Sequence, residues 1–318
     1  MIFFISVLRA FAAMIITNSH YTGVYPHDII ANGGLYGDVI FFAVSGFCLV
    51  NIKQKFKLWY PKRILRCYIA TIIITAVYML VGLYPPPGGV QSWIYWFIYP
   101  TNYHFVASIV LLYIPFYFVA KTEKLRNNIP KVMGIVFVVY VLIYVFIYDK
   151  SYYHIDTVRQ PMIRFLFFEA MLLGAYFKIN MEKFINKKSV FDYIMVAITF
   201  ILYFASKLAF SKIDSISNFQ IFNQIVLIVL LYFTFKSFCG LDSMLEKLPN
   251  PIKKVINYLA EITLEIYVVQ YAIIPRLAKV APFPANWLLI TASILVAASA
   301  LHFVVKIINR QTDKLFTR

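Results

Sequence analysis

Two ionisable residues interrupt the first apolar stretch of the chain. Arg9 and His20 lie in the segment LRAFAAMIITNSHY, which is otherwise apolar enough to enter a membrane. Eleven residues make about three helical turns, so both side chains lie on one face of the expected helix, roughly 16 Å apart along its axis. An ionisable group inside hydrocarbon costs several kcal/mol unless it faces protein or water. The pair therefore indicates chemistry at this helix rather than simple anchoring.

A carboxylate follows His20 closely enough in the sequence to act on it. Asp38 lies near the start of the next apolar segment, GGLYGDVIFFAVSGFCLV, after a hairpin of about a dozen residues. A carboxylate that holds an imidazole fixes its tautomer and raises its basicity, which prepares a general base. The sequence equally allows Asp38 to cap its helix and His20 to form only a hydrogen bond at the membrane interface.

Small and basic residues follow in the next two segments. Ser45 precedes Gly46 in the middle of a span, where small residues favour close helix packing and no GxSxG elbow supports a nucleophilic serine. Arg63 and Arg66 are three residues apart, so they share a helix face and suit phosphate oxygens. Basic residues of this kind are also typical of cytoplasmic loops.

Four polar residues in later spans are further candidates. Arg164 and Glu169 are five residues apart, so they point in different directions and each needs its own partner. Glu169 is the deeper of the two, where an unpaired carboxylate is costly. Tyr267 and Gln270 lie on neighbouring faces of the span LAEITLEIYVVQYAIIP. Hydrogen bonds between helices explain these residues equally well.

Composition requires the elements that position these residues to be membrane helices. The chain has 318 residues, of which 61% are hydrophobic and 14% charged, whereas about a quarter of a soluble domain is charged. Long runs such as VMGIVFVVYVLIYVFIY show no alternation of polar and apolar residues. We expect an all-α, polytopic membrane protein with one domain over residues 1–318. The ten expected spans are 2–21, 35–52, 64–83, 104–120, 131–148, 161–179, 190–208, 219–237, 255–275 and 287–308.

The basic residues orient these spans. Of the 30 Lys and Arg residues, 22 fall on the side that also holds both termini, seven fall on the other side, and Arg9 is the remaining one. The excess predicts that both termini are cytoplasmic. Topology and attraction to anionic headgroups explain the net charge of +16, so we expect membrane lipid and no nucleic acid as a partner. The three cysteines indicate neither a disulfide nor a metal site.

Taken in order, these segments resemble acyltransferase family 3, a large family of membrane-bound acyltransferases. Five family patterns have counterparts in this chain. The pattern LRG or LRA with a later His corresponds to Leu8-Arg9-Ala10 and His20, and the pattern GVDLFFVLSGF corresponds to residues 37–47. The patterns RxxR, R…FLLG and ISYxxYLVH correspond to Arg63 with Arg66, to residues 164–174 and to residues 262–270. Gln270 stands where many members have His, so we expect at most a hydrogen bond there.

The resemblance implies transfer of an acyl group, commonly acetyl, from cytoplasmic acyl-CoA to a hydroxyl of an envelope glycan or a lipid-linked acceptor. Acyl-CoA is then a donor substrate, and we expect no permanently bound cofactor and no metal. A multi-pass protein of the bacterial cytoplasmic membrane suits this reaction. The roles implied are a catalytic group (His20 as base, Asp38, Arg9), a CoA group (Arg63, Arg66, Ser45) and an acceptor group (Arg164, Glu169, Tyr267, Gln270).

A transporter or flippase for an anionic or lipid-linked solute is the alternative. Arg9, Arg164 and Glu169 would then line its path. The sequence shows no inverted repeat and no paired broken helices, which argues against it. A structural or sensory scaffold explains the bundle but leaves the helix face that carries Arg9 and His20 unexplained.

Overall fold

Every regular element in the described residues, 2–158 and 161–315 of the computed structural model, is helical. Arg159 and Arg318, counted above among the loop cations, lie outside the described residues. The elements are α1 (Phe3–Ser19), η1 (Asp28–Ile30), α2 (Gly34–Leu49), α3 (Phe56–Leu80), α4 (Val90–Trp93), the π-helix η2 (Ile94–Ile98), α5 (His104–Lys121), α6 (Glu123–Arg126), α7 (Ile129–Phe146), α8 (Ile163–Ile179), η3 (Met181–Lys183), α9 (Val190–Lys212), η4 (Asp214–Phe219), α10 (Ile221–Gly240), α11 (Asp242–Leu245), α12 (Asn250–Glu261), α13 (Thr263–Leu277) and α14 (Ala285–Leu315).

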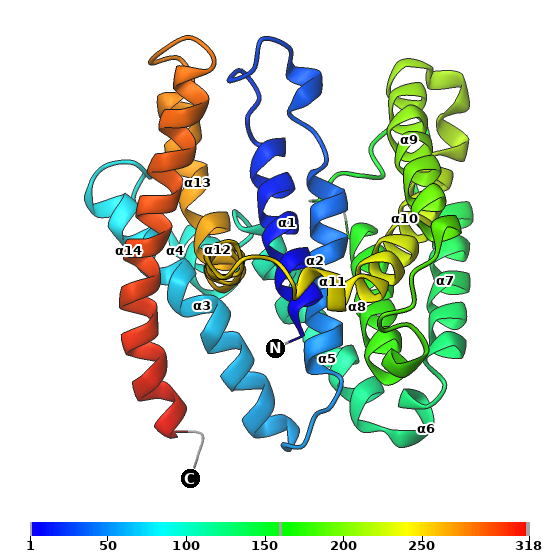
Figure 1. Ribbon diagram of the computed structural model, residues 1–318. Coiled ribbons are helices and arrows are strands. Elements are labelled where there is room, and N and C mark those ends of the chain that lie inside the picture. Colours follow the sequence, from blue (N-terminus) through cyan, green and yellow to red (C-terminus); the bar gives the residue numbers. More distant parts are fainter. Residues whose placement is uncertain (1, 159–160, 316–318) are drawn as a thin grey trace. The chain divides into compact units, whose positions relative to one another are not determined.

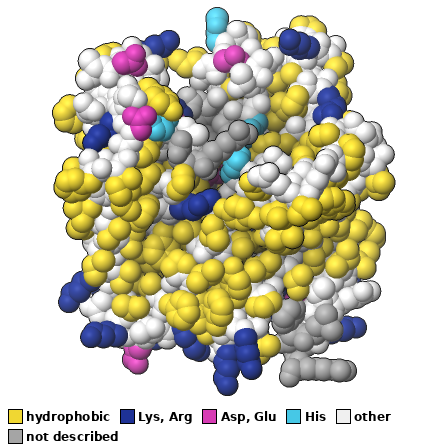
Figure 2. All heavy atoms as spheres, turned by 180° about the vertical axis from the view of Figure 1, so that it is seen from behind, with side chains coloured by type: hydrophobic (Ala, Val, Ile, Leu, Met, Phe, Trp, Pro, Cys, Tyr) yellow, Lys and Arg dark blue, Asp and Glu magenta, His cyan; other side chains and the backbone are white. Residues whose placement is uncertain are grey.

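The helices have the length and composition of membrane spans. Among the described residues, seven helices are long and apolar enough to cross a membrane. The other three expected spans coincide with the shorter helices α1, α8 and α13, of 17, 17 and 15 residues. Figure 2 shows hydrophobic side chains spread over one face and Lys and Arg side chains mostly toward its lower and upper edges. The chain is a polytopic membrane protein, while the count of ten spans and the cytoplasmic termini stay predictions.

Three helix boundaries differ from the expected ones. The expected span 255–275 consists of two helices, α12 and α13, with Ile262 between them. The residues of α12, NPIKKVINYLAE, place polar and apolar side chains on opposite faces, as in a helix that lies along an interface. The other two differences are that α3 starts at Phe56 and that α14 continues to Leu315, so both helices extend past the expected spans into charged sequence.

The chain forms two compact units. Unit 1 combines Met1–Leu8, Asp38–Lys53 and Pro115–Lys254, and unit 2 combines Arg9–Gly37, Gln54–Ile114 and Val255–Arg318. Helices α1, α2, α5 and α12 each contribute residues to both units. The expectation of one domain over the whole chain stays a prediction.

In unit 1, α7 packs against α8, and α10 packs against both α8 and α9. Helices α2 and α8 cross at glycines: a Cβ on Gly46 would lie 1.9 Å from the Met171 carbonyl oxygen, and one on Gly174 would lie 1.7 Å from the Ala43 carbonyl oxygen. No side chain fits there, so the two backbones touch. The close packing expected from the small residues around Ser45 is therefore present.

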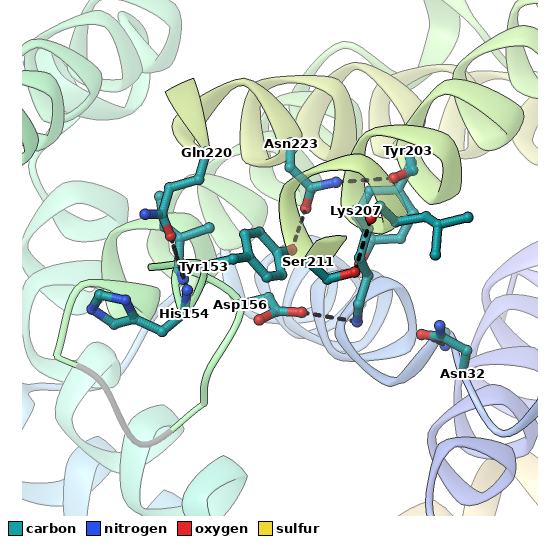
Figure 3. Close-up of polar contacts among 12 residues, drawn as sticks. Asn32, Tyr153, His154, Asp156, Tyr203, Lys207, Ser211, Gln220 and Asn223 are labelled. Carbon is teal, nitrogen blue, oxygen red and sulfur yellow. Dashed lines mark hydrogen bonds and ion pairs between the residues drawn. The ribbon is translucent and has the colours of Figure 1, made fainter. Parts of the chain in front are cut away.

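A polar network holds the loop 147–158 of unit 1 against α9 and α10 (Figure 3). Gln220 Oε1 accepts from the backbone N–H groups of His154 and Ile155 at 3.0 and 2.9 Å, and its Nε2 donates to the Tyr152 carbonyl at 3.0 Å. An ion pair of 2.8 Å joins Lys207 of α9 to Asp156. Because buried amides are stable only when hydrogen-bonded, this network fixes the loop.

In unit 2, helices α3, α13 and α14 pack against one another, with α14 the longest of them (Figure 1). The Tyr78 hydroxyl of α3 donates to the Val269 carbonyl of α13 at 2.7 Å. Glycine allows α2 to meet α1, since a Cβ on Gly37 would lie 2.9 Å from the Ala12 carbonyl oxygen. These helices form the frame of the candidate site.

Candidate active site

His20 lies directly after the end of α1, in a group of aromatic rings. Its backbone N–H donates to the Thr17 carbonyl at 3.0 Å, which closes the last turn of the helix. The half-buried imidazole meets the Tyr271 ring of α13 edge to face, with centroids 5.1 Å apart. Tyr271 in turn contacts Tyr103 at 5.5 Å and Tyr267 at 5.4 Å. We call His20, Tyr103, Tyr267 and Tyr271 the aromatic cluster.

Hydroxyl groups make the aromatic cluster polar as well as rigid. The Tyr267 hydroxyl accepts from the backbone N–H of Phe105 at 3.2 Å. The Thr75 hydroxyl donates to the Tyr103 hydroxyl at 3.4 Å. Sequence reasoning missed Tyr103 and Tyr271. Tyr271 follows Tyr267 by four residues and so shares its helix face, which was an available signal.

Gln270 of α13 is a predicted site residue whose buried amide has no hydrogen-bond partner among the described residues of unit 2. Its side chain is fully buried, yet neither Oε1 nor Nε2 has a hydrogen-bond partner among the described residues of unit 2. Gln270 lies within one turn of Tyr267 and directly before Tyr271. Because an unsatisfied buried amide costs about 1–3 kcal/mol per group, such a residue is a strong candidate for contact with a substrate.

A second polar group of unit 2 lies around Tyr113 of α5. The charges of Arg63 from α3 and Arg9 from α1 both act on the Tyr113 hydroxyl. The Arg63 guanidinium also lies over the Trp59 ring, 6.0 Å from its centroid. We call Arg9, Arg63 and Tyr113 the basic group, because its two cations come from different helices and approach one hydroxyl.

Arg66 is held by an acidic residue of the last helix. Asp313 of α14 forms ion pairs with Lys62 at 2.9 Å and with Arg66 at 3.3 Å. The Arg66 and Asp313 side chains are each 42% exposed, so the pair is open to solvent and weak. A phosphate can therefore compete with Asp313 for these two cations.

Two segments each place one residue of the basic group and one of the aromatic cluster at similar spacing, with His20 just past the end of α1 and Tyr103 just before the start of α5. Along α1, eleven residues separate Arg9 from His20, which is roughly 16 Å in a helix. Along α5, ten residues separate Tyr103 from Tyr113, or roughly 15 Å. Arg9 acts on Tyr113, and Tyr103 contacts Tyr271, the ring that contacts His20. The chain segments around α1 and α5 therefore connect the same two groups.

Comparison with known proteins identifies the family. A family model described as an acyltransferase domain matches residues 2–306, nearly the whole chain. The chain belongs to acyltransferase family 3. No curated protein and no solved structure matches the chain. The acyltransferase domain therefore includes both the aromatic cluster and the basic group.

Unit 1 of the acyltransferase holds the remaining candidates. Asp38 is buried in the second turn of α2, which starts at Gly34, so the idea that it caps the helix is wrong. Ser45 lies half-buried beside the α2–α8 crossing, and Arg164 lies in the first turn of α8. The pairing of His20 with Asp38 joins residues of different units and stays a prediction, as do the roles of Ser45 and Arg164.

Glu169 lies in a small apolar pocket of the acyltransferase. The pocket has a volume of about 260 Å³ between α7, α8 and α10 of unit 1, and Tyr140 and Gln224 also line it. Glu169 is 5% exposed, and its Oε1 has no hydrogen-bond partner among the described residues of that unit. A carboxylate in such surroundings is costly, as the sequence indicated.

Proposed function

We propose that this acyltransferase moves an acyl group, most simply acetyl, from cytoplasmic acyl-CoA to a hydroxyl of an extracytoplasmic or lipid-linked glycan in the bacterial cytoplasmic membrane. The observation that carries the proposal is the arrangement of unit 2. The His20 imidazole lies in the aromatic cluster just past the end of α1, whereas Arg9, in the middle of α1, and Arg63 of α3 both act on Tyr113 of α5. Acyl transfer from CoA needs a base at the thioester and cations at the phosphates.

The length of the donor fits the separation of the two groups. An extended pantetheine arm spans on the order of 15–20 Å at the spacing of a bonded chain. The distance from Arg9 to His20 along α1 is of the same size, roughly 16 Å. A CoA whose phosphates meet Arg9 and Arg63, with Arg66 nearby, would bring its thioester to His20. Arg9 then holds the donor and takes no part in proton transfer.

The proposed chemistry is direct transfer with His20 as general base. A ring nitrogen of neutral His20 removes the proton of the acceptor hydroxyl as that oxygen attacks the thioester carbonyl carbon. The carbon–sulfur bond then breaks, and the CoA thiolate takes the proton back from the imidazolium. Asp38 would hold the imidazole in the required tautomer. Transient acylation of His20 itself is the variant of this mechanism.

Gln270 and the tyrosines would supply the polar contacts. The buried amide of Gln270 can donate to a carbonyl oxygen on which negative charge develops, since such donors are worth most in a water-excluded site. Tyr271 positions the imidazole through the edge-to-face contact. Tyr267, Arg164 and Glu169 remain candidates for the acceptor.

The decisive test compares two histidines of the same chain region. His20→Ala should abolish acetyl esters on envelope glycans, measured by mass spectrometry in cells with matched levels of membrane protein. His27→Ala is the matched control, because His27 lies exposed seven residues later, in the same loop. Near-normal acetylation by His20→Ala would refute the assignment of the base. Solute flux in proteoliposomes, without release of CoA thiol from acetyl-CoA by the purified protein, would favour the transporter instead.

A further inference from the structure

A pocket of about 400 Å³ opens on unit 2 between α1, α13 and α14, with Leu259 of α12 as a further wall. Its walls are hydrocarbon side chains from these helices, among them Phe11, Ile266 and Ile294. None of the described residues that line it is Lys, Arg, Asp, Glu or His. This volume is typical of pockets that bind small molecules. The uncharged walls suit an uncharged, apolar ligand.

The pocket opens toward the membrane. Met14 lines it and is 62% exposed, although it lies in the middle of α1. An exposed apolar residue at the middle of a membrane helix faces hydrocarbon. A ligand can therefore reach the pocket sideways from the bilayer, without crossing water.

One end of the pocket is polar. There the Tyr21 hydroxyl and the Thr291 hydroxyl of α14 are 2.9 Å apart, and the Tyr25 hydroxyl donates to Asn18 Oδ1 at 2.7 Å. Thr17 also lines the pocket. It is 9% exposed, and its Oγ1 has no hydrogen-bond partner among the described residues of unit 2. A buried hydroxyl without a partner in a pocket wall indicates a polar group of a ligand at this end.

The dimensions select the kind of ligand. At roughly 30 Å³ for a group the size of one water molecule, 400 Å³ holds about a dozen heavy atoms, which is a stretch of one hydrocarbon chain. A partner helix is about 10 Å in diameter and requires several times this volume. The polar end coincides with the end of α1, where His20 lies between Asn18 and Tyr21 in the sequence.

We propose that this pocket holds the hydrocarbon anchor of a lipid-linked acceptor, whose head group then lies at the end of α1 beside His20. The inference rests on the proposed function and narrows its acceptor to the lipid-linked class. At the end of α1, Tyr21 contacts α14 and His20 contacts α13, so the pocket and the imidazole lie on different sides of one chain segment. The head group must extend past this segment, a distance of about one helix diameter, 10 Å.

Two neighbouring residues of α14 provide a matched test. Leu295 lines the pocket, whereas Val296 does not line it and is 71% exposed. The full chain in nanodiscs is labelled with a photoreactive polyprenyl phosphate, and the labelled peptides are located by mass spectrometry. The labels should map to α1 and α14 around the pocket. Leu295→Trp should reduce this labelling about tenfold, because the indole fills the pocket, and Val296→Trp should leave it unchanged.

Two results would overturn the proposal. One is equal labelling of the two tryptophan variants when both fold, as judged by unchanged thermal stability. If Leu295→Trp is unstable, Met14→Trp takes its place in the comparison. The other is loss of the label to excess phosphatidylglycerol as readily as to excess unlabelled polyprenyl phosphate, which would assign the pocket to bulk lipid. Because the experiment measures binding and not acyl transfer, its failure is distinct from failure of His20 as the base.

Discussion

Gln270 and Gln220 should respond in opposite ways to the same substitution. Both side chains are fully buried, and both are glutamines of membrane helices or their ends. Gln220 takes part in three hydrogen bonds, whereas neither amide atom of Gln270 has a partner among the described residues of unit 2. Leucine has a similar size but no polar atoms, so the exchange isolates the hydrogen bonding.

The magnitude follows from counting the polar groups. Each unsatisfied buried polar group costs about 1–3 kcal/mol, and Gln270 has two such groups, so Gln270→Leu should raise the free energy of unfolding by about 2–6 kcal/mol. Gln220→Leu leaves the backbone N–H groups of His154 and Ile155 without an acceptor, so it should lower the free energy by about 2–5 kcal/mol. Activity should show a different order. Gln270→Leu should lower kcat about 100-fold, as expected when a donor to a developing negative charge is lost.

The assay is thermal unfolding of the purified variants in one detergent, followed by CoA release under saturating acetyl-CoA. A clear drop in the melting temperature of Gln270→Leu, similar to that of Gln220→Leu, would show that Gln270 holds the bundle together. Unchanged kcat in a stable Gln270→Leu variant would remove the residue from the site.

Two further predictions concern helix packing and the CoA entrance. Gly174→Ala should lower the free energy of unfolding by about 1–3 kcal/mol, because its Cβ would lie 1.7 Å from the Ala43 carbonyl oxygen, while Gly134→Ala, with no atom within 4 Å, should not lower it. Thermal melts of both variants check this, and equal melting temperatures would contradict the close crossing of α2 and α8. Asp313→Asn should tighten CoA binding about two- to fivefold at low salt, since it releases Lys62 and Arg66 from an exposed ion pair. Calorimetric titration with CoA measures this, and weaker binding would show that the pair serves only to join α3 to α14.

The helical class of the protein could be predicted because it depends on local composition. A chain that is 61% hydrophobic with long unbroken apolar runs must satisfy its backbone within helices. The break at Ile262 could not be predicted with the same method, since an apolar window averages over the polar face of α12. The α2–α8 crossing could be predicted only in part. Its glycines indicate that two helices pack closely, but they do not indicate which helix provides the partner.

The sequence by itself determined the family and the membrane class, and it made Arg9, His20, Arg63 and Arg66 candidates, because motif spacing along one helix is a local property. Only the tertiary structure decided that His20 contacts Tyr271, that Arg9 and Arg63 act on one tyrosine, and that Asp313 pairs with Arg66. His20, Arg9 and Arg66 each lie more than 50 residues along the chain from the partner named here. Helix packing, which follows from side-chain shape rather than from sequence order, brings them together.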